Sequence, residues 1–240
     1  VTGNATYTAK WTINSHDLVI DYQYADGSKA ADQHKETLTY GSEYEVTSPV
    51  IPGYTADIEV VDGTMGDADA KYVVTYTAND DTTYTVEYYY AVDGAYPKTA
   101  TSSDDRTGTT DTTASVTDAD KTPTEAGYAY DTAAANVESG NIAGDGSLVL
   151  KVYFKEQFTV TYKPGDHGTF QETSTGSLDY GVATPAAPET TGEEGYTFAG
   201  WDKTIPTTMP AEDLTITALF TINQYTLTFV VDGTENKSTL

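Results

Sequence analysis

One pattern of residues returns four times along the chain, and this repetition restricts the fold more than any other feature of the sequence. Each copy is a short run in which apolar and polar residues alternate, at residues 18–24, 84–90, 158–162 and 225–231. Alternation with a period of two is typical of a strand with one buried face. Asp-Gly or Pro-Gly follows each run, and these dipeptides favour a tight turn. The sequence therefore predicts four strands that each lead into a turn.

Two further features recur behind the first three runs. A Gly-Tyr dipeptide stands near the middle of each repeat, at Gly53-Tyr54, Gly127-Tyr128 and Gly195-Tyr196. A second alternating segment closes each repeat, at residues 72–76, 148–154 and 214–220. These features divide the chain into three repeats of roughly 70 residues, which we call the first (15–80), second (81–156) and third (157–222) repeat.

A repetition over a longer distance indicates which modules the two ends of the chain belong to. Residues 7–14 have the pattern of residues 216–223, and a strand with a turn follows both. We therefore expect residues 1–14 to end an upstream module and residues 223–240 to open the next one. Only three residues, 79–81 and 155–157, separate a closing strand from the next opening strand. Because such linkers leave little freedom, the modules are expected to form a stiff, elongated array.

The composition is typical of a mostly β chain, α+β at most. The 44 threonines and 20 tyrosines suit pleated strands and are weak helix formers. Residues 112–121 and 133–137 are the two candidate helices. The Asp- and Thr-rich stretch 99–120 is expected to be a long loop, because it lacks apolar periodicity.

The net charge of −25 excludes several kinds of partner. Phosphate backbones and anionic membrane surfaces repel a chain this acidic. No segment approaches the about 18 apolar residues of a membrane span. The chain has no cysteine, which excludes disulfides and thiolate-bound metals. We expect a monomer with no nucleic-acid partner and no membrane insertion.

Residues 17–77 resemble a mucin-binding-protein (MucBP) repeat. The resemblance lies in the strand Val19-Ile20-Asp21-Tyr22, in Asp26-Gly27, Tyr40-Gly41, Tyr44 and Pro52-Gly53-Tyr54, and in the closing segment 73–76. Residues 84–154 resemble the same repeat more loosely, with a larger middle loop. Residues 158–221 are similar to the internalin-type B repeat (the Listeria–Bacteroides repeat), through the motif Gly-Tyr-Thr-Phe-Ala-Gly-Trp-Asp-Lys at residues 195–203.

The resemblance implies a fold and a setting. Each unit would be β-grasp-like, so the chain would be a tandem array of small β-grasp-like modules. Such repeats are exposed on large wall-anchored proteins of Gram-positive bacteria, and they are linked to adhesion, including adhesion to mucin.

The sequence offers little for catalysis. It has three histidines, His16, His34 and His167, and no Gly-Xaa-Ser-Xaa-Gly motif. His167 lies in the predicted turn 165–168. A glycosidase needs two carboxylates in a deep cleft, for which small stacked β modules have little room. We therefore expect no enzyme and no cofactor.

Two kinds of binding site stay open. Asp104, Asp105 and Asp111 cluster in the second repeat and could offer oxygen ligands to calcium, although no EF-hand loop is present and a solvated acidic loop is the plainer interpretation. Tyr89 must face away from Tyr88 and Tyr90, so it could contact a ligand if that face is solvent. The two tryptophans, Trp11 and Trp201, are interpreted as packing residues rather than as platforms for sugar rings.

These observations predict a non-enzymatic extracellular repeat segment of a bacterial cell-surface adhesin, anchored to the cell wall through a region outside these residues. The segment would act as an extended stalk whose modules contact their neighbours in the same chain. Host mucin or glycans are the candidate ligands. The alternative function is an accessory, non-catalytic region of a secreted hydrolase.

Overall fold

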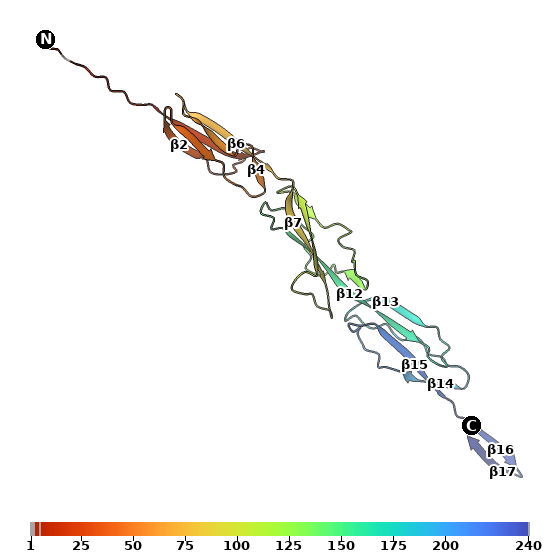
Figure 1. The fold of residues 1–240 in the computed structure, drawn as a ribbon. Coiled ribbons are helices and arrows are strands. Elements are labelled where there is room, and N and C mark those ends of the chain that lie inside the picture. The colour runs from red at the N-terminus through yellow and green to blue at the C-terminus, as the bar shows by residue number, and fades with distance from the viewer. Residues whose placement is uncertain (1–2, 5, 240) are drawn as a thin grey trace. The chain divides into compact units, whose positions relative to one another are not determined.

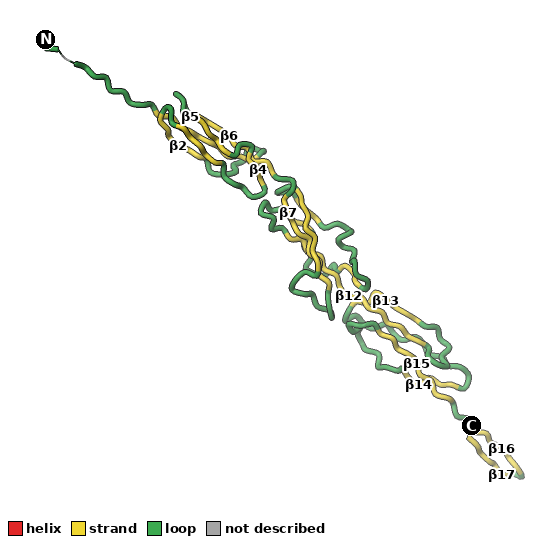
Figure 2. The backbone as a smooth tube through the Cα atoms, viewed as in Figure 1, coloured by secondary structure: helices red, strands yellow, loops and turns green. Residues whose placement is uncertain are grey.

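A computed structural model describes residues 3–4 and 6–239, and all the regular secondary structure in this part of the chain is β (Figure 1, Figure 2). The expectation of a mostly β chain is confirmed. The strands belong to two compact units. Unit 1 is Val1–Val86, Asp104–Ser115 and Glu138–Leu150, and unit 2 is Glu87–Ser103, Val116–Val137 and Lys151–Leu240. The described residues include no helix that is long and apolar enough to cross a membrane.

Unit 1 is organised around a four-stranded mixed sheet. The strands of unit 1 are β1 (Ser15–Tyr24), β2 (His34–Thr39), β3 (Glu43–Thr47), β4 (Tyr54–Ala56), β5 (Val60–Thr64), β6 (Ala70–Ala78), β9 (Thr113–Ser115) and β11 (Ser139–Asn141). The order in the main sheet is β2-β1-β6-β4. β1 is antiparallel to β2 and parallel to β6, while β4 is antiparallel to β6. β3 with β5, and β9 with β11, form two small antiparallel sheets.

The core of unit 1 follows from the alternation along β1. Leu18, Ile20 and Tyr22 are buried, whereas Asp21 between them is exposed. Val74 and Tyr76 pack against this row from β6, which lies beside β1. The period of two in the sequence therefore produced the buried face that it predicts.

Unit 2 contains a second mixed sheet. The strands that lie wholly within unit 2 are β10 (Tyr128–Tyr130), β13 (Thr173–Asp179), β14 (Tyr196–Trp201), β15 (Leu214–Ile222), β16 (Thr226–Val231) and β17 (Thr234–Thr239). β7 (Thr82–Tyr90), β8 (Ser102–Gly108) and β12 (Val149–Lys163) contribute residues to both units. The strand order is β14-β15-β12-β7-β8, and β10 and β13 also pair with β12. β16 and β17 form a separate hairpin.

The third repeat is built like the first. β12 is antiparallel to β13 and parallel to β15, and β14 is antiparallel to β15, which is the arrangement of β1, β2, β6 and β4. Both methionines lie at matching places, because Gly41 donates its N–H to the carbonyl of Met65 and Gly181 donates to that of Met209, at 2.9 Å each. The first and third repeats thus share one arrangement of four strands.

Some local predictions were wrong. The stretch 99–120 is not a long loop, because it holds β8 and β9, and neither 112–121 nor 133–137 is helical. Trp201 packs against the rings of Tyr162, Phe170 and Phe198, as a packing residue should. Trp11 lies outside the strands with 92% of its surface exposed, so it has no packing role in the described part of the chain.

Candidate functional site

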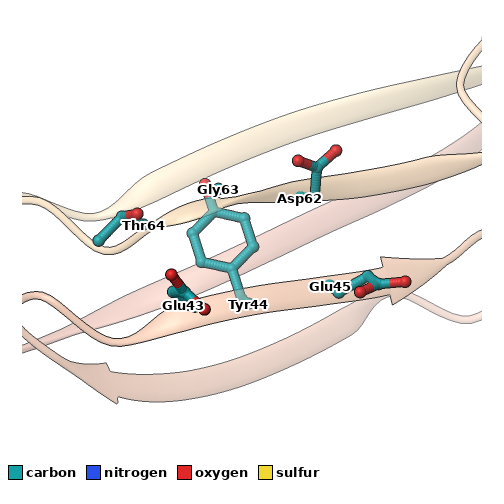
Figure 3. A pocket seen from close by; sticks show the side chains of 6 residues that line it. All are labelled: Glu43, Tyr44, Glu45, Asp62, Gly63 and Thr64. Atoms are coloured by element: carbon teal, nitrogen blue, oxygen red, sulfur yellow. The ribbon is translucent and has the colours of Figure 1, made fainter.

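An open depression of about 360 Å³ lies over the β3–β5 sheet of unit 1 (Figure 3). Tyr44 stands opposite Gly63, and Glu45 stands opposite Asp62. A side chain at Gly63 would meet the Tyr44 hydroxyl at 2.7 Å, so glycine there leaves room for the ring. Glu43 and Thr64 complete the lining. Because neighbouring residues of a strand point to opposite faces, Glu43, Glu45 and Asp62 share the outer face, whereas the Tyr44 ring lies on the core face and covers Gly63.

Hydrogen bonding holds this ring in place. The hydroxyl groups of Tyr44 and Tyr72 lie 2.7 Å apart, and their ring centroids are 6.3 Å apart. The hydrogen bond with Tyr72, followed by burial and by the negative charge of Asp62, raises the pKa of Tyr44 to about 12. The phenol is therefore neutral at physiological pH, and its hydroxyl is engaged by Tyr72.

The carboxylates of this depression set the charge of what it can accept. Glu45 and Asp62 are directly opposite across the strands, where like charges destabilise a sheet. Carboxylates accept hydrogen bonds and repel anions. The depression therefore suits neutral hydroxyl-bearing groups or cations, and it disfavours sulfate or carboxylate groups. Sequence analysis singled out Tyr44 only within the repeat pattern, although its position between Glu43 and Glu45 was a visible signal.

Tyr89 lies on the face that alternation predicts, but that face is covered. Its ring is 5% exposed and stacks on Tyr153 with centroids 4.6 Å apart. Its hydroxyl donates to a carboxylate oxygen of Glu87 at 2.6 Å, and this bond raises the pKa of Tyr89 to about 12. The Lys151 ammonium lies 5.7 Å from the ring centroid. Little of Tyr89 is left for a ligand, and its binding role stays a prediction.

The three aspartates considered for calcium are not brought together. Asp104 pairs with Arg106 at 3.4 Å, Asp105 accepts a hydrogen bond from Thr85, and Asp111 accepts one from Tyr54. Among the residues that the structure describes, no group of three or more histidine, cysteine, aspartate or glutamate side chains is arranged to hold a metal ion. Of the histidines, His167 stacks on Tyr196 at 3.7 Å and lies 2.9 Å from Glu193 on the surface.

The chain is similar to known proteins over part of its length. Residues 41–80, which include the Tyr44 depression, match the Muc B2-like domain family. Internalin H of Listeria monocytogenes serovar 1/2a is 49% identical over 61 residues, which are 22% of this chain and 11% of that protein. The chain thus spans about a tenth of the length of this curated relative.

Two solved structures are also similar over short stretches. The type 2 repeat of the mucus binding protein MUB from Lactobacillus reuteri is 23% identical with a TM-score of 0.26, over 27% of this chain and 49% of that one. A MucBP domain from Lactobacillus acidophilus is 24% identical with a TM-score of 0.25, over 28% of this chain and 94% of that one. The predicted resemblance to MucBP and internalin repeats is confirmed by the family match and by internalin H.

Proposed function

We propose that this chain is a non-catalytic, extracellular segment of a bacterial cell-surface protein and serves as a spacer between other parts of that protein. The observation that carries the proposal is the repetition of one sheet architecture in the first and third repeats. The 15-residue strand β12 supports it, because it closes the second repeat and opens the third without a break. The match to a Muc B2-like domain and the similarity to internalin H support the surface setting.

The spacer would work through hydrogen-bond ladders and charge. Strand ladders keep each repeat folded when the chain is pulled. The net charge of −25 makes neighbouring repeats repel each other within a Debye length of about 8 Å, which resists collapse and self-association. A monomer whose main contacts are its own neighbouring repeats follows from this proposal.

Small-angle X-ray scattering of the intact chain tests the spacer function. A single compact domain of 240 residues would have a radius of gyration of about 18 Å. We expect roughly twice that value, because a row of small modules is longer than one globule of equal mass. The value should fall only slightly when salt is raised, since strands and short linkers hold the array as well as charge does. A radius near 18 Å would contradict the spacer function.

Recognition of neutral host glycans, such as the uncharged sugars of mucin, is a second candidate function. It is favoured by the three carboxylates of the Tyr44 depression, which lies inside the matched residues 41–80. Carboxylates at Glu43, Glu45 and Asp62 accept hydrogen bonds from sugar hydroxyls and repel sialylated or sulfated chains. We therefore propose neutral glycans as the ligand class.

A glycan array probed with the intact chain and with Glu45→Gln tests this second function. We expect binding to uncharged glycans that falls about tenfold or more in Glu45→Gln, since a hydrogen bond to a charged group is often worth about 1.5–3 kcal/mol. Glu36→Gln is the matched control, because Glu36 belongs to the same repeat, is exposed and does not line the depression. Equal binding by both variants would remove the depression as the site, and a preference for sialylated glycans would contradict the charge argument.

The alternative function, an accessory region of a secreted hydrolase, shares the same fold and the same extracellular setting. It differs only in what else the full-length gene encodes. Reading that gene separates the two, because a catalytic domain in it would favour the hydrolase and a wall-sorting signal would favour the surface protein.

A further inference from the structure

The same backbone hydrogen bond recurs where each repeat ends. Asn79 and Asn223 directly follow the closing strands β6 and β15, and Gln157 lies inside β12, where the second repeat passes into the third. Asn79, Gln157 and Asn223 donate their N–H to the carbonyl oxygens of Gly53, Gly127 and Gly195, at 2.8, 2.7 and 2.7 Å. These glycines are the ones that precede tyrosine in the three repeats. All three have a positive φ, at 76°, 82° and 87°, which side-chain-bearing residues rarely adopt. The Gly-Tyr dipeptide therefore fixes the path by which the chain leaves its repeat.

In unit 1 the same place receives residues of the second repeat. Thr110, which is 3% exposed, donates its N–H to the carbonyl of Asn79 at 2.9 Å, and its hydroxyl lies 2.7 Å from that of Thr82. Gly144 lies against Pro52 and Gly53, so closely that a side-chain carbon on either glycine would collide with the backbone of the other segment. Bare backbone on both sides is what permits this approach.

The tyrosine of the dipeptide adds a polar contact to the second repeat. Tyr54 donates its hydroxyl to a carboxylate oxygen of Asp111 at 2.6 Å, and its ring packs on Tyr24 with centroids 4.7 Å apart. Asp111 has a φ of 62°, so the turn that carries it is held in the left-handed region. The Thr55 hydroxyl donates to the side-chain oxygen of Asn79 at 2.6 Å, and Thr197 makes the same bond with Asn223 at 2.5 Å.

Unit 2 contains a different contact between the second and third repeats, which does not involve the Gly127-Tyr128 dipeptide. Lys155 of the second repeat pairs with Asp179 of the third at 2.5 Å. Gly94 donates its N–H to Glu156 at 2.9 Å and lies against the ring of Tyr180. Residues around the exit of the second repeat thus contact the opening hairpin of the third.

At the third copy of the dipeptide, Gly195-Tyr196, the surface that corresponds to the one occupied at Gly53-Tyr54 is open. A depression of about 370 Å³ is lined there by Gly195, Tyr196 and Asn223, together with Ile222 and Tyr225. Nothing among the described residues lies within 4 Å of the position that a side chain at Gly195 would occupy. The first copy is filled by Thr110 and Gly144, so the two copies differ in occupancy and share their hydrogen bonds.

We infer that the Gly-Tyr dipeptide is a docking surface for the following repeat at its first and third copies. At the second copy, the carbonyl oxygen of Gln157 is all that the described chain places within 4 Å of the position that a side chain at Gly127 would occupy, so that copy is not filled in this way. The partner that the docking surface fits is a turn presenting a threonine, an aspartate and a bare glycine, which Thr110, Asp111 and Gly144 supply in unit 1. The docked turn fixes the place of residues 104–115 and 138–150 of the second repeat against the first repeat, within unit 1. The biological purpose of this docking rests on the proposed spacer function, whereas the contact itself does not. Small-angle scattering therefore tests the spacer function, and the distance measurement on spin-labelled chains tests the docking independently.

The lack of cysteine allows a direct test on the intact chain. Ala68→Cys and Ser115→Cys place two spin labels at exposed positions of unit 1, one in the first repeat and one in the second. Pulsed electron paramagnetic resonance then gives the distribution of distances between them. We expect one narrow distribution, and in Gly53→Ala a broad one, because the added carbon meets the backbone of Gly144 and the hydroxyl of Thr110.

Gly41→Ala is the matched control for backbone strain. Gly41 has a φ of 80° in the same unit, and nothing lies within 4 Å of an added carbon there. The distribution should stay narrow in this variant. If Gly41→Ala broadens it as much as Gly53→Ala, strain rather than docking is the cause and the proposal is overturned. A distribution that stays narrow in Gly53→Ala also overturns it.

If circular dichroism shows that Gly53→Ala unfolds unit 1, Tyr54→Phe provides a second test of the docking. This variant keeps the ring on Tyr24 and removes only the hydroxyl that binds Asp111. The undocked fraction should rise about fivefold, the usual effect of losing one hydrogen bond. Tyr40→Phe, which removes an exposed hydroxyl outside the contact, should change nothing. Equal distributions in Tyr54→Phe and in the native chain would overturn the proposal.

Discussion

Replacing Phe154 by alanine is expected to lower the free energy of unfolding of unit 2 by about 3–5 kcal/mol, the usual cost of emptying a buried phenylalanine site. The ring is 1% exposed on β12. It stacks on Tyr90 with centroids 4.7 Å apart and on Tyr88 at 6.5 Å, and it meets Tyr130 edge to face at 6.4 Å. Rings held in strands cannot collapse into the space, so the cavity persists. Since small domains have only about 5–15 kcal/mol in total, a large share of the stability is lost.

Urea unfolding followed by two probes measures this effect. Far-ultraviolet circular dichroism reports the strands, and fluorescence reports Trp201, which packs against Tyr162 in the same unit. Both midpoints should fall together if unit 2 unfolds cooperatively. Val92→Ala is the control, because Val92 belongs to unit 2 and is 61% exposed, and it should cost under about 0.5 kcal/mol. A loss below about 1 kcal/mol in Phe154→Ala would mean that the ring does not anchor the core.

The strands could be predicted because their signal is local. The alternation of Leu18, Ile20 and Tyr22 is in the sequence, and the sheet buries those three side chains. The same holds for Val160 and Tyr162 in the third repeat. A hydrophobic period of two needs no knowledge of which strands become neighbours.

Edge strands and covered faces could not be predicted in this way. β8 lies at the end of the sheet order and most of its residues are exposed, so it has no apolar alternation to reveal it. Its order comes from pairing with a neighbouring strand rather than from burial. Tyr89 faces away from Tyr90 as expected, but Tyr153 covers it, and only the pairing of distant strands decides that.

The candidate sites also divide into features that the local sequence predicts and features that depend on distant residues. Asp104 and Asp105 are neighbours in a strand, so their side chains point to opposite faces and cannot share one ion. The recurrence of Gly53-Tyr54 was visible in the sequence, whereas its contact with Thr110 and Gly144 was not, because those residues lie more than fifty positions further along the chain.

Raising the pH from 10 to 12 is expected to unfold the chain. Eight tyrosines have a pKa above the ordinary value, namely Tyr22, Tyr44, Tyr54, Tyr76, Tyr89, Tyr96, Tyr128 and Tyr162. Burial is the main cause for Tyr22, Tyr76 and Tyr162. The hydrogen bond to Asp111 is the main cause for Tyr54, whose pKa rises to about 12.

The sign of the effect follows from proton binding. Below pH 10 these phenols are protonated in both the folded and the unfolded chain, so their contribution to stability is fully present. Between pH 10 and 12 the unfolded chain releases protons at the ordinary pKa of about 10, while the folded chain retains them. The folded state then binds more protons, and the free energy of unfolding falls as pH rises. Each ionised phenol also adds negative charge to a chain that already carries −25.

Circular dichroism and tyrosinate absorbance, recorded together against pH, measure this transition. We expect the circular dichroism to change in one cooperative step above pH 10, together with the part of the absorbance that comes from these eight tyrosines, because their phenols ionise only when the sheets open. Tyr54→Phe and Tyr89→Phe should move the step to higher pH, since each removes one group that titrates on unfolding. Tyr7→Phe is the control, because this ring is 94% exposed and its loss should leave the step in place. Complete ionisation of the tyrosines with native circular dichroism would show that these hydroxyls are open to solvent, contrary to their burial and hydrogen bonds.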